Sequence, residues 1–133
     1  VPFKHTIDLL TTKLREDNIT TEIIRGDVSA GKRTEIFKRF QEADDPRVLV
    51  IQPQSAAHGV TLTAANTVVW WAPTSSLETY AQANARVHRS GQDHKWTVVQ
   101  LQGSHAEKRV YALLDNRIDI HTKMIDLYKE ILD

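Results

Sequence analysis

Two arginines, Arg86 and Arg89, lie three residues apart in the stretch QANARVHRSGQ, which runs from Gln82 to Gln92. At this spacing two side chains share one face of an α-helix. Two guanidinium groups held side by side repel each other unless an anion lies between them, and the planar fork of donors on each matches phosphate oxygens. The spacing favours a phosphate-binding site about equally with a solvated helix end, where the helix macrodipole also stabilises cations.

A second segment with phosphate-binding features, GDVSAGKR, runs from Gly26 to Arg33. Its GxxxxGK pattern follows a predicted strand and precedes a predicted helix, as a phosphate-binding loop requires. The next position should carry a magnesium-binding hydroxyl, but it is Arg33, and the strand that should end in an acid ends in Gln52. We predict that Gly26 forms a turn and Ser29 caps a helix. A complete small P-loop kinase is the alternative, and it would need this chain to bind ATP and magnesium alone.

Histidine, cysteine and tryptophan indicate no second site. The sequence has six histidines and no cysteine, which excludes disulfides and thiolate metal sites. His88 and His94 are the close pair near the arginines, but they straddle a turn at Gly91 and no carboxylate cluster joins them. We therefore predict no metal site. Trp70 and Trp71 could stack on bases, but their place at the end of an apolar strand favours packing in the core or at a sheet edge.

Short apolar runs alternate with longer amphipathic ones, which is the pattern of βαβ units and a parallel sheet. The predicted strands are the strand end 1–3, then 21–25, 47–52, 67–71 and 95–101. The predicted helices are 6–16, 32–41, 75–89 and a long final one, 104–131, that breaks or projects. We therefore predict an α/β fold with a doubly wound, mainly parallel sheet, flanked by helices and followed by a long C-terminal helix. Ligands of such folds bind at loops leaving the carboxyl ends of the strands.

The composition is that of one globular domain. With 133 residues, 41% of them apolar and 26% charged, the chain is not of the disordered class. It has no apolar run of membrane-spanning length and no signal peptide, so we expect no membrane partner. Its 17 basic and 17 acidic side chains balance, so any argument for nucleic acid must be local. The chain opens on Val1 without Met, and we expect residues 1–133 to be a fragment of a larger protein.

The stretch QANARVHRSGQ resembles motif VI of superfamily-two helicases, specifically the Swi/Snf-like branch, whose pattern is approximately QAxxRxxRxGQ. The matching residues are Gln82, Ala83, Arg86, Arg89, Gly91 and Gln92. Asn84 and His88 at the variable positions resemble phage and prophage members of the branch.

A second segment, residues 55–65, resembles motif V of the same family, which is usually close to AGGxGINLTAA. Gly59, Leu62, Thr63, Ala64 and Ala65 match. Ala56 and Ala57 replace the paired glycines and Thr61 replaces the usual Asn. Gly26, Arg33 and Phe40 resemble the segment between motifs IV and V, so the resemblance covers nearly the whole chain.

The resemblance implies a RecA-like fold and identifies residues 1–133 as the helicase C-terminal (second RecA-like) motor domain of an ATP-dependent DNA helicase or translocase. ATP with Mg2+ would be held mainly by a missing first RecA-like domain, and Arg86 and Arg89 would be the arginine fingers. The implied ATP-binding residues of this chain are Gln82, Gly59 and Thr61. The implied nucleic-acid-binding residues are Lys4, His5, Arg33, Gln54 and Ser55.

The expected partners are nucleic acid, with DNA as the track, and the N-terminal RecA-like domain of the same protein. We expect the domain to be part of an ATP-hydrolysing enzyme and to be inactive in isolation. The expected location is cytoplasmic, in the host if a phage encodes the protein, or nucleoid-associated. The alternative function is a degenerate, non-catalytic helicase-like domain that acts as a binding or docking module.

Overall fold

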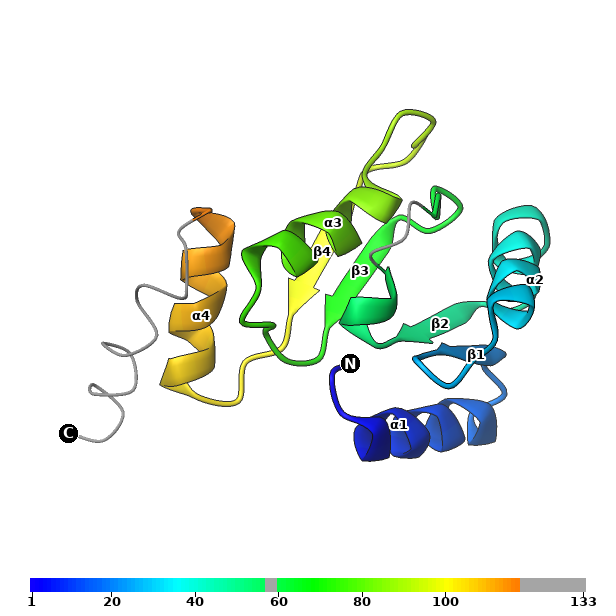
Figure 1. Ribbon diagram of the computed structural model, residues 1–133, viewed down its shortest axis with the longest axis horizontal. Helices are drawn as coiled ribbons and strands as arrows, with labels where there is room; N and C mark the ends of the chain where they lie inside the picture. Colours follow the sequence, from blue (N-terminus) through cyan, green and yellow to red (C-terminus); the bar gives the residue numbers. More distant parts are fainter. Residues whose placement is uncertain (57–59, 118–133) are drawn as a thin grey trace.

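A computed structural model describes residues 1–56 and 60–117, and within them helices alternate with short parallel strands (Figure 1). The helices are α1 (Lys4–Glu16), α2 (Ala30–Glu42), α3 (Leu77–Val87) and α4 (His105–Asp115), with a 3-10 turn η1 (Pro53–Ala56). The strands are β1 (Thr21–Ile24), β2 (Val48–Ile51), β3 (Thr67–Trp70) and β4 (Thr97–Gln100). The alternation confirms the predicted α/β fold with parallel strands.

The four described strands form two parallel pairs. Thr21 lies opposite Val48 in the pair β1–β2, and Thr67 lies opposite Thr97 in the pair β3–β4. Helices α2 and α3 make the crossovers within the two pairs (Figure 1). A cavity of about 390 Å³ lies between the pairs and is lined by both β2 and β3. In the described part of the chain, the predicted sheet is therefore present as two halves.

The start of the chain lies between the two strand pairs (Figure 1). The amino group of Val1 donates a hydrogen bond to the carbonyl oxygen of Ile51 at 2.9 Å, at the carboxyl end of β2. The strand end predicted at residues 1–3 is wrong, because Phe3 already serves as the N-cap of α1.

Trp70 anchors the core of the β3–β4 half. Its ring lies 4.8 Å from that of Tyr80, and it packs with Tyr111 and Leu114 in one buried cluster. Its indole Nε1 donates to Asn84 Oδ1 at 2.9 Å, so the one polar atom of the ring is satisfied. Trp71 is 40% exposed and borders the cavity between the strand pairs. These positions agree with the predicted packing role of both tryptophans.

Serine caps begin three of the helices where the sequence indicates. The hydroxyl oxygens of Ser29, Ser76 and Ser104 each accept a backbone N–H from the first turn of α2, α3 and α4. Gly26 lies in the turn after β1, as predicted, where the backbone N–H of Val28 donates to the carbonyl oxygen of Arg25 at 3.0 Å. Helix α4 ends at Asp115, and the rest of the helix predicted for 104–131 beyond residue 117 lies outside the described residues.

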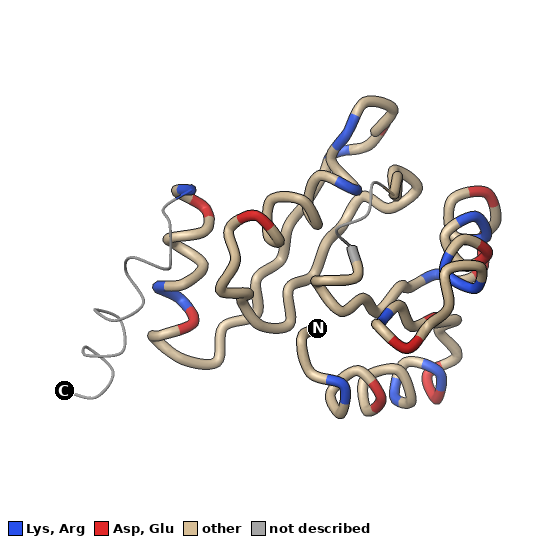
Figure 2. The backbone as a smooth tube through the Cα atoms, viewed as in Figure 1, with Lys and Arg blue, Asp and Glu red and all other residues tan. Residues whose placement is uncertain are grey.

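Charges of both signs alternate along α1 and α2 (Figure 2). Several form surface ion pairs, such as Lys13 with Asp17 at 3.8 Å and Lys32 with Glu35 at 3.6 Å. In the part of the chain that the structure describes, no helix is long and apolar enough to cross a bilayer.

Candidate functional site

The two arginines lie on either side of the end of α3. Arg86 belongs to the last helical turn and is half-buried, whereas Arg89 is exposed in the turn that follows. The prediction that the helix continues to Arg89 is wrong, because His88 leaves the helical region at ψ 84°. The arginines are therefore brought together by a turn and not by a shared helical face. Gly91, with φ of +97°, turns the chain as expected.

The segment 60–65 lies directly against this turn. The backbone N–H of Leu62 donates to the carbonyl oxygen of Arg86 at 2.8 Å. Arg89 Nη1 donates to the hydroxyl oxygen of Thr61 at 3.2 Å and to the carbonyl oxygen of Val60 at 3.4 Å. The structure thus joins Thr61 to Arg89 and the neighbouring Leu62 to Arg86, although more than twenty residues separate each pair in the chain.

Of the other two predicted ATP-binding residues, the structure describes one, Gln82, and not the other, Gly59. Gln82 lies on α3 one turn before Arg86, and its Nε2 donates to Glu78 Oε1 at 3.0 Å. Gly59 lies outside the described residues. The described part of the candidate site therefore consists of Arg86, Arg89 and Thr61, with Gln82 beside them on α3.

Two of the predicted nucleic-acid-binding residues, Lys4 and Arg33, converge on the loop that follows β1. Lys4 Nζ lies 3.7 Å from Asp27 Oδ2, and the neighbouring His5 is exposed on α1. Arg33 Nη2 donates to the carbonyl oxygen of Arg25 at 3.0 Å, so its guanidinium points to the end of β1. Its Nε is buried without a hydrogen-bond partner among the described residues. Lys4 and His5 are accessible to a ligand, and Arg33 is largely turned inward.

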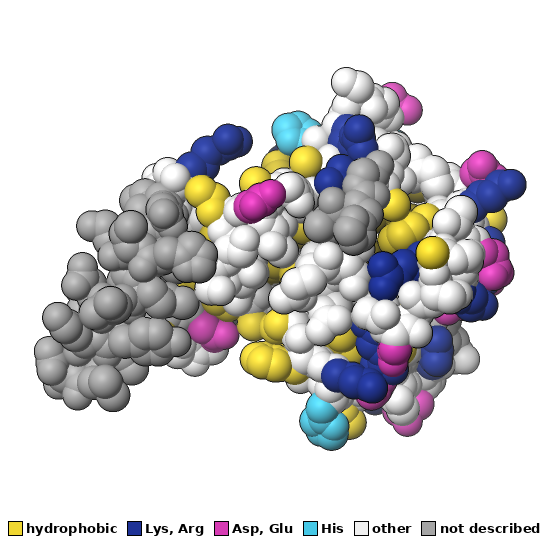
Figure 3. Space-filling view, viewed as in Figure 1, with side chains coloured by type: hydrophobic (Ala, Val, Ile, Leu, Met, Phe, Trp, Pro, Cys, Tyr) yellow, Lys and Arg dark blue, Asp and Glu magenta, His cyan; other side chains and the backbone are white. Residues whose placement is uncertain are grey.

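Arg25 carries much of the local charge at this loop and is already paired. Its Nη1 lies 2.8 Å from Asp8 Oδ1 and its Nε lies 3.0 Å from Asp27 Oδ1. The hydrogen bonds that Arg25 donates to the carboxylates of Asp8 and Asp27 raise the pKa of Arg25, and the Arg25 guanidinium holds the pKa of the Asp27 carboxyl below its usual range. Figure 3 shows this mixture of basic and acidic side chains over α1 and α2.

The remaining two predicted nucleic-acid-binding residues, Gln54 and Ser55, lie in η1 after β2. Gln54 is exposed, whereas Ser55 is only 9% exposed and η1 packs against α3. Gln54 is therefore the accessible residue of the two. Gln54 thus lies on the element that packs against the helix carrying Arg86.

The residues that would hold magnesium in a phosphate-binding loop do not fit that role here. The Ser29 hydroxyl accepts from Lys32 N at 3.2 Å as a helix cap, and Arg33 occupies the position of the metal-binding hydroxyl. Gln52 at the end of β2 donates its Nε2 to the carbonyl oxygen of Pro2 at 3.4 Å. Among residues 1–56 and 60–117, no three His, Cys, Asp or Glu side chains cluster to hold a metal ion. The side chains at these positions therefore do not form a magnesium site of the phosphate-loop type.

Two glutamines that contact the site had no role assigned from the sequence. Gln92 hydrogen-bonds to the carbonyl oxygens of Ala65 and Val87, and Gln41 of α2 bonds to Thr63 and Ala64. Gln92 matches the motif VI pattern, so the sequence marked this position but did not indicate what its side chain contacts. Gln41 had no sequence signal, because its contacts form across more than twenty residues.

Comparison with known proteins adds an independent observation. Residues 1–91 match the protein family described as "Helicase conserved C-terminal domain". The chain is 34% identical over 129 residues to the "Bifunctional helicase and thymine dioxygenase JBP2" of Leishmania tarentolae, which covers 94% of this chain and 11% of that protein. It is 36% identical over 97 residues to the "DNA annealing helicase and endonuclease ZRANB3" of Homo sapiens, covering 68% of this chain and 9% of that protein.

Among solved structures, the chain is similar to the C-terminal part of the Fun30 ATPase domain, with a TM-score of 0.75. That similarity covers 84% of this chain and 37% of the other at 20% identity, so it supports the fold alone. The chain spans about a tenth of the length of the two curated relatives (11% and 9%).

Proposed function

The chain belongs to the helicase conserved C-terminal domain family, and on that basis we propose that residues 1–133 form the second RecA-like motor domain of an ATP-dependent DNA helicase or translocase. The motif VI pattern from Gln82 to Gln92 supports membership of the Swi/Snf-like branch. DNA as the track is supported by the relative described as a DNA annealing helicase. ATP with Mg2+ would be held mainly by a first RecA-like domain, because the magnesium-binding positions of this chain do not fit.

The observation that carries the proposal is the contact of the segment 60–62 with Arg86 and Arg89. Among the described residues, the contacts of Arg89 use Nη1 alone, which leaves its Nε and Nη2 donors for phosphate oxygens. Arg86 is held at the same place because its carbonyl oxygen accepts from Leu62. The backbone of Arg86 and the guanidinium of Arg89 are thereby held beside the same segment, which supports a role of both side chains in stabilising charge on a transferred phosphoryl group.

In this proposal the domain closes on ATP and brings Arg86 and Arg89 to the γ-phosphate. Gln82, Gly59 and Thr61 would line the same cleft. Fixed cations placed where charge develops lower the barrier without having to reorganise during the reaction. Bound ATP would supply the phosphoryl group and its magnesium would neutralise part of the charge, while Arg86 and Arg89 would orient and stabilise that group.

The proposed DNA track runs past the loops that leave β1 and β2. The residues assigned to it are Lys4, His5, Arg33, Gln54 and Ser55. The exposed members Lys4, His5 and Gln54 offer donors that bind phosphates and carry no sequence code. Arg33, by contrast, is largely turned inward and Ser55 is nearly buried. We therefore expect sequence-tolerant binding that is weak for this half alone, because its net charge is zero.

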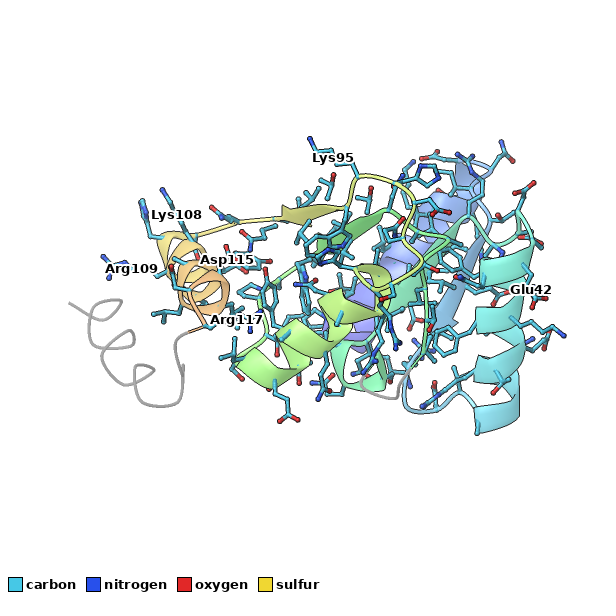
Figure 4. The ribbon with its side chains drawn as sticks, turned by 90° about the horizontal axis from the view of Figure 1, so that it is seen from above. Glu42, Lys95, Lys108, Arg109, Asp115 and Arg117 are labelled. Atoms are coloured by element: carbon cyan, nitrogen blue, oxygen red, sulfur yellow. The ribbon has the colours of Figure 1, made fainter. Side chains whose placement is uncertain are left out.

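DNA-stimulated ATP hydrolysis by the full-length protein tests the assignment. Arg86→Ala or Arg89→Ala should each lower kcat on the order of 10³-fold, as loss of an arginine finger does. Lys108→Ala is the matched control, since Lys108 is exposed on α4 and points away from the body of the domain (Figure 4). Unchanged turnover in both arginine variants would refute the finger assignment and favour a non-catalytic docking module.

Two further expectations belong to the same proposal. The isolated domain should hydrolyse no ATP, because the phosphate loop and metal ligands would lie in the first domain. A phage or prophage source and a cytoplasmic or nucleoid-associated location, inferred from Asn84 and His88 in motif VI and from composition, stay predictions.

A further inference from the structure

The side-chain amide of Gln92 links three backbone positions around the turn after α3. Its Nε2 donates to the carbonyl oxygen of Ala65 at 2.6 Å and to that of Val87 at 3.1 Å. Its Oε1 accepts from the backbone N–H of His94 at 3.2 Å. Carbonyl oxygens can only accept and a backbone N–H can only donate, so one orientation of the amide satisfies all three contacts. Gln92 therefore ties the segment 60–65 to the end of α3.

Gln41 holds the segment 60–65 from the opposite side, through α2. Its Nε2 donates to the hydroxyl oxygen of Thr63 at 2.7 Å, and its Oε1 accepts from the backbone N–H of Ala64 at 3.0 Å. The Gln41 amide nitrogen contacts a hydroxyl, which can donate as well as accept, whereas the Gln92 amide nitrogen contacts carbonyl oxygens, which can only accept. A carboxylate in place of the Gln41 amide keeps both hydrogen bonds, whereas a carboxylate at 92 loses both Nε2 bonds.

The backbone that Gln92 holds is the backbone that carries the two arginines. Val87 directly follows Arg86, and Leu62 of the tied segment donates to the Arg86 carbonyl at 2.8 Å. Thr61 of the same segment accepts from Arg89. A displacement of the segment relative to the turn therefore disturbs the backbone contact of Arg86 and the guanidinium contact of Arg89 at once.

We propose that Gln92 is a positioning residue for the Arg86–Arg89 pair. It acts through the carbonyl oxygens of Ala65 and Val87 and has no contact with the phosphate itself. This inference rests on the proposed function of the arginines, and it adds a residue whose role neither the motif pattern nor the family match states. Gln41 anchors the same segment to α2, so the arginines are located relative to both halves of the domain.

The first test compares the same substitution at the two glutamines in the full-length protein. Gln92→Glu places a carboxylate against two carbonyl oxygens, which pushes the segment away from the turn. We expect kcat for DNA-stimulated ATP hydrolysis to fall roughly 10- to 100-fold, since a displacement of about 1 Å can cost 10²-fold. The KM for ATP should change less than about 3-fold, because the lost interaction acts in the transition state. Gln41→Glu should leave kcat within about 2-fold, because both of its hydrogen bonds survive.

The second test asks whether Gln92 acts through the arginines. In an Arg89→Ala background, Gln92→Glu should lower kcat by no more than about 2-fold further, because two changes that disable one element are not additive. A full additional loss in that background would overturn the proposal.

Backbone hydrogen exchange, measured beside kcat, distinguishes a failure of the positioning role from a failure of the proposed function. In Gln92→Glu the amides of residues 60–66 should exchange faster, while those of β1 and β2 stay protected, which shows that the fold is intact. If the arginine variants lower kcat but Gln92→Glu does not, the positioning role is wrong and the proposed function stands. Faster exchange with unchanged kcat likewise overturns the positioning role alone. If neither arginine variant changes turnover, the proposed function itself fails.

Discussion

Tyr111 lies at the centre of the core that joins α4 to β3, and its hydroxyl makes the stability of that core depend on pH. The side chain is 1% exposed and the hydroxyl donates to the carbonyl oxygen of Trp70 at 3.2 Å. Burial, followed by the nearby charge of Glu107, raises the pKa of Tyr111 from its ordinary 10.0 to about 12. The folded state therefore favours the neutral phenol. The resulting stability is fully present below pH 10 and is lost as the pH rises toward 12.

The substitution Tyr111→Phe removes both the hydrogen bond and the ionisable group. Only the effect of the ionisable group depends on pH, so measurements at several pH values separate the two. At pH 8 the substitution should cost only about 1 kcal/mol, because the Trp70 carbonyl also accepts from the N–H of Leu101 at 3.0 Å and is not left unpaired. A pKa shift of about two units corresponds to roughly 2.7 kcal/mol in total, of which about 1.4 kcal/mol is lost by pH 11. The phenylalanine variant should therefore become the more stable of the two near pH 11.

Urea unfolding of both proteins, followed by far-ultraviolet circular dichroism at about pH 8, 10 and 11, measures this difference. Other groups that titrate in this range contribute to both proteins and cancel in the comparison. A difference in unfolding free energy that stays constant from pH 8 to pH 11 would refute the argument from burial. A wild-type protein that remains the more stable at pH 11 would refute the size of the shift.

Two further changes test the turn and the proposed DNA track. Gly91→Ala places a side chain at φ +97°, which should cost on the order of 1–2 kcal/mol in urea unfolding, and equal stability would contradict the strain. Lys4→Ala should weaken DNA binding alike for unrelated sequences and reduce the slope of log K against log salt by about 0.7–0.9. Lys13→Ala is its matched control, because Lys13 lies on the same helix and pairs with Asp17, and an equal effect of both variants would contradict the assigned track.

Local features of the fold followed directly from neighbouring residues. The caps at Ser29 and Ser104 depend on a hydroxyl that reaches an N–H three residues ahead, so the sequence alone predicts them. The apolar runs that became β2 and β3 were equally clear, because such runs are typical of parallel strands, although Val69 of β3 is 53% exposed. The ends of elements were less predictable: α3 stops at Val87, two residues before the predicted end.

That early end has a tertiary cause. The carbonyl oxygens of Arg86 and Val87 accept from Leu62 and Gln92, partners that a continuing helix would not meet. The shared helical face expected for Arg86 and Arg89 was wrong for this reason, even though both residues were identified. The ion pair between Arg25 and Asp8 was likewise not predictable from the sequence, because it joins α1 to the end of β1.

The residue types at the candidate site are a property of the sequence: two arginines, a threonine and glutamines at characteristic spacing. Their assembly is a property of the folded chain. Thr61 meets Arg89, and Ala65 meets Gln92, across 28 and 27 positions, because α3 crosses over between the parallel strands β3 and β4 and returns the chain to the same edge. Partners so far apart in the sequence meet only because the crossover helix places the two strands side by side. No pattern of neighbouring residues predicts that arrangement.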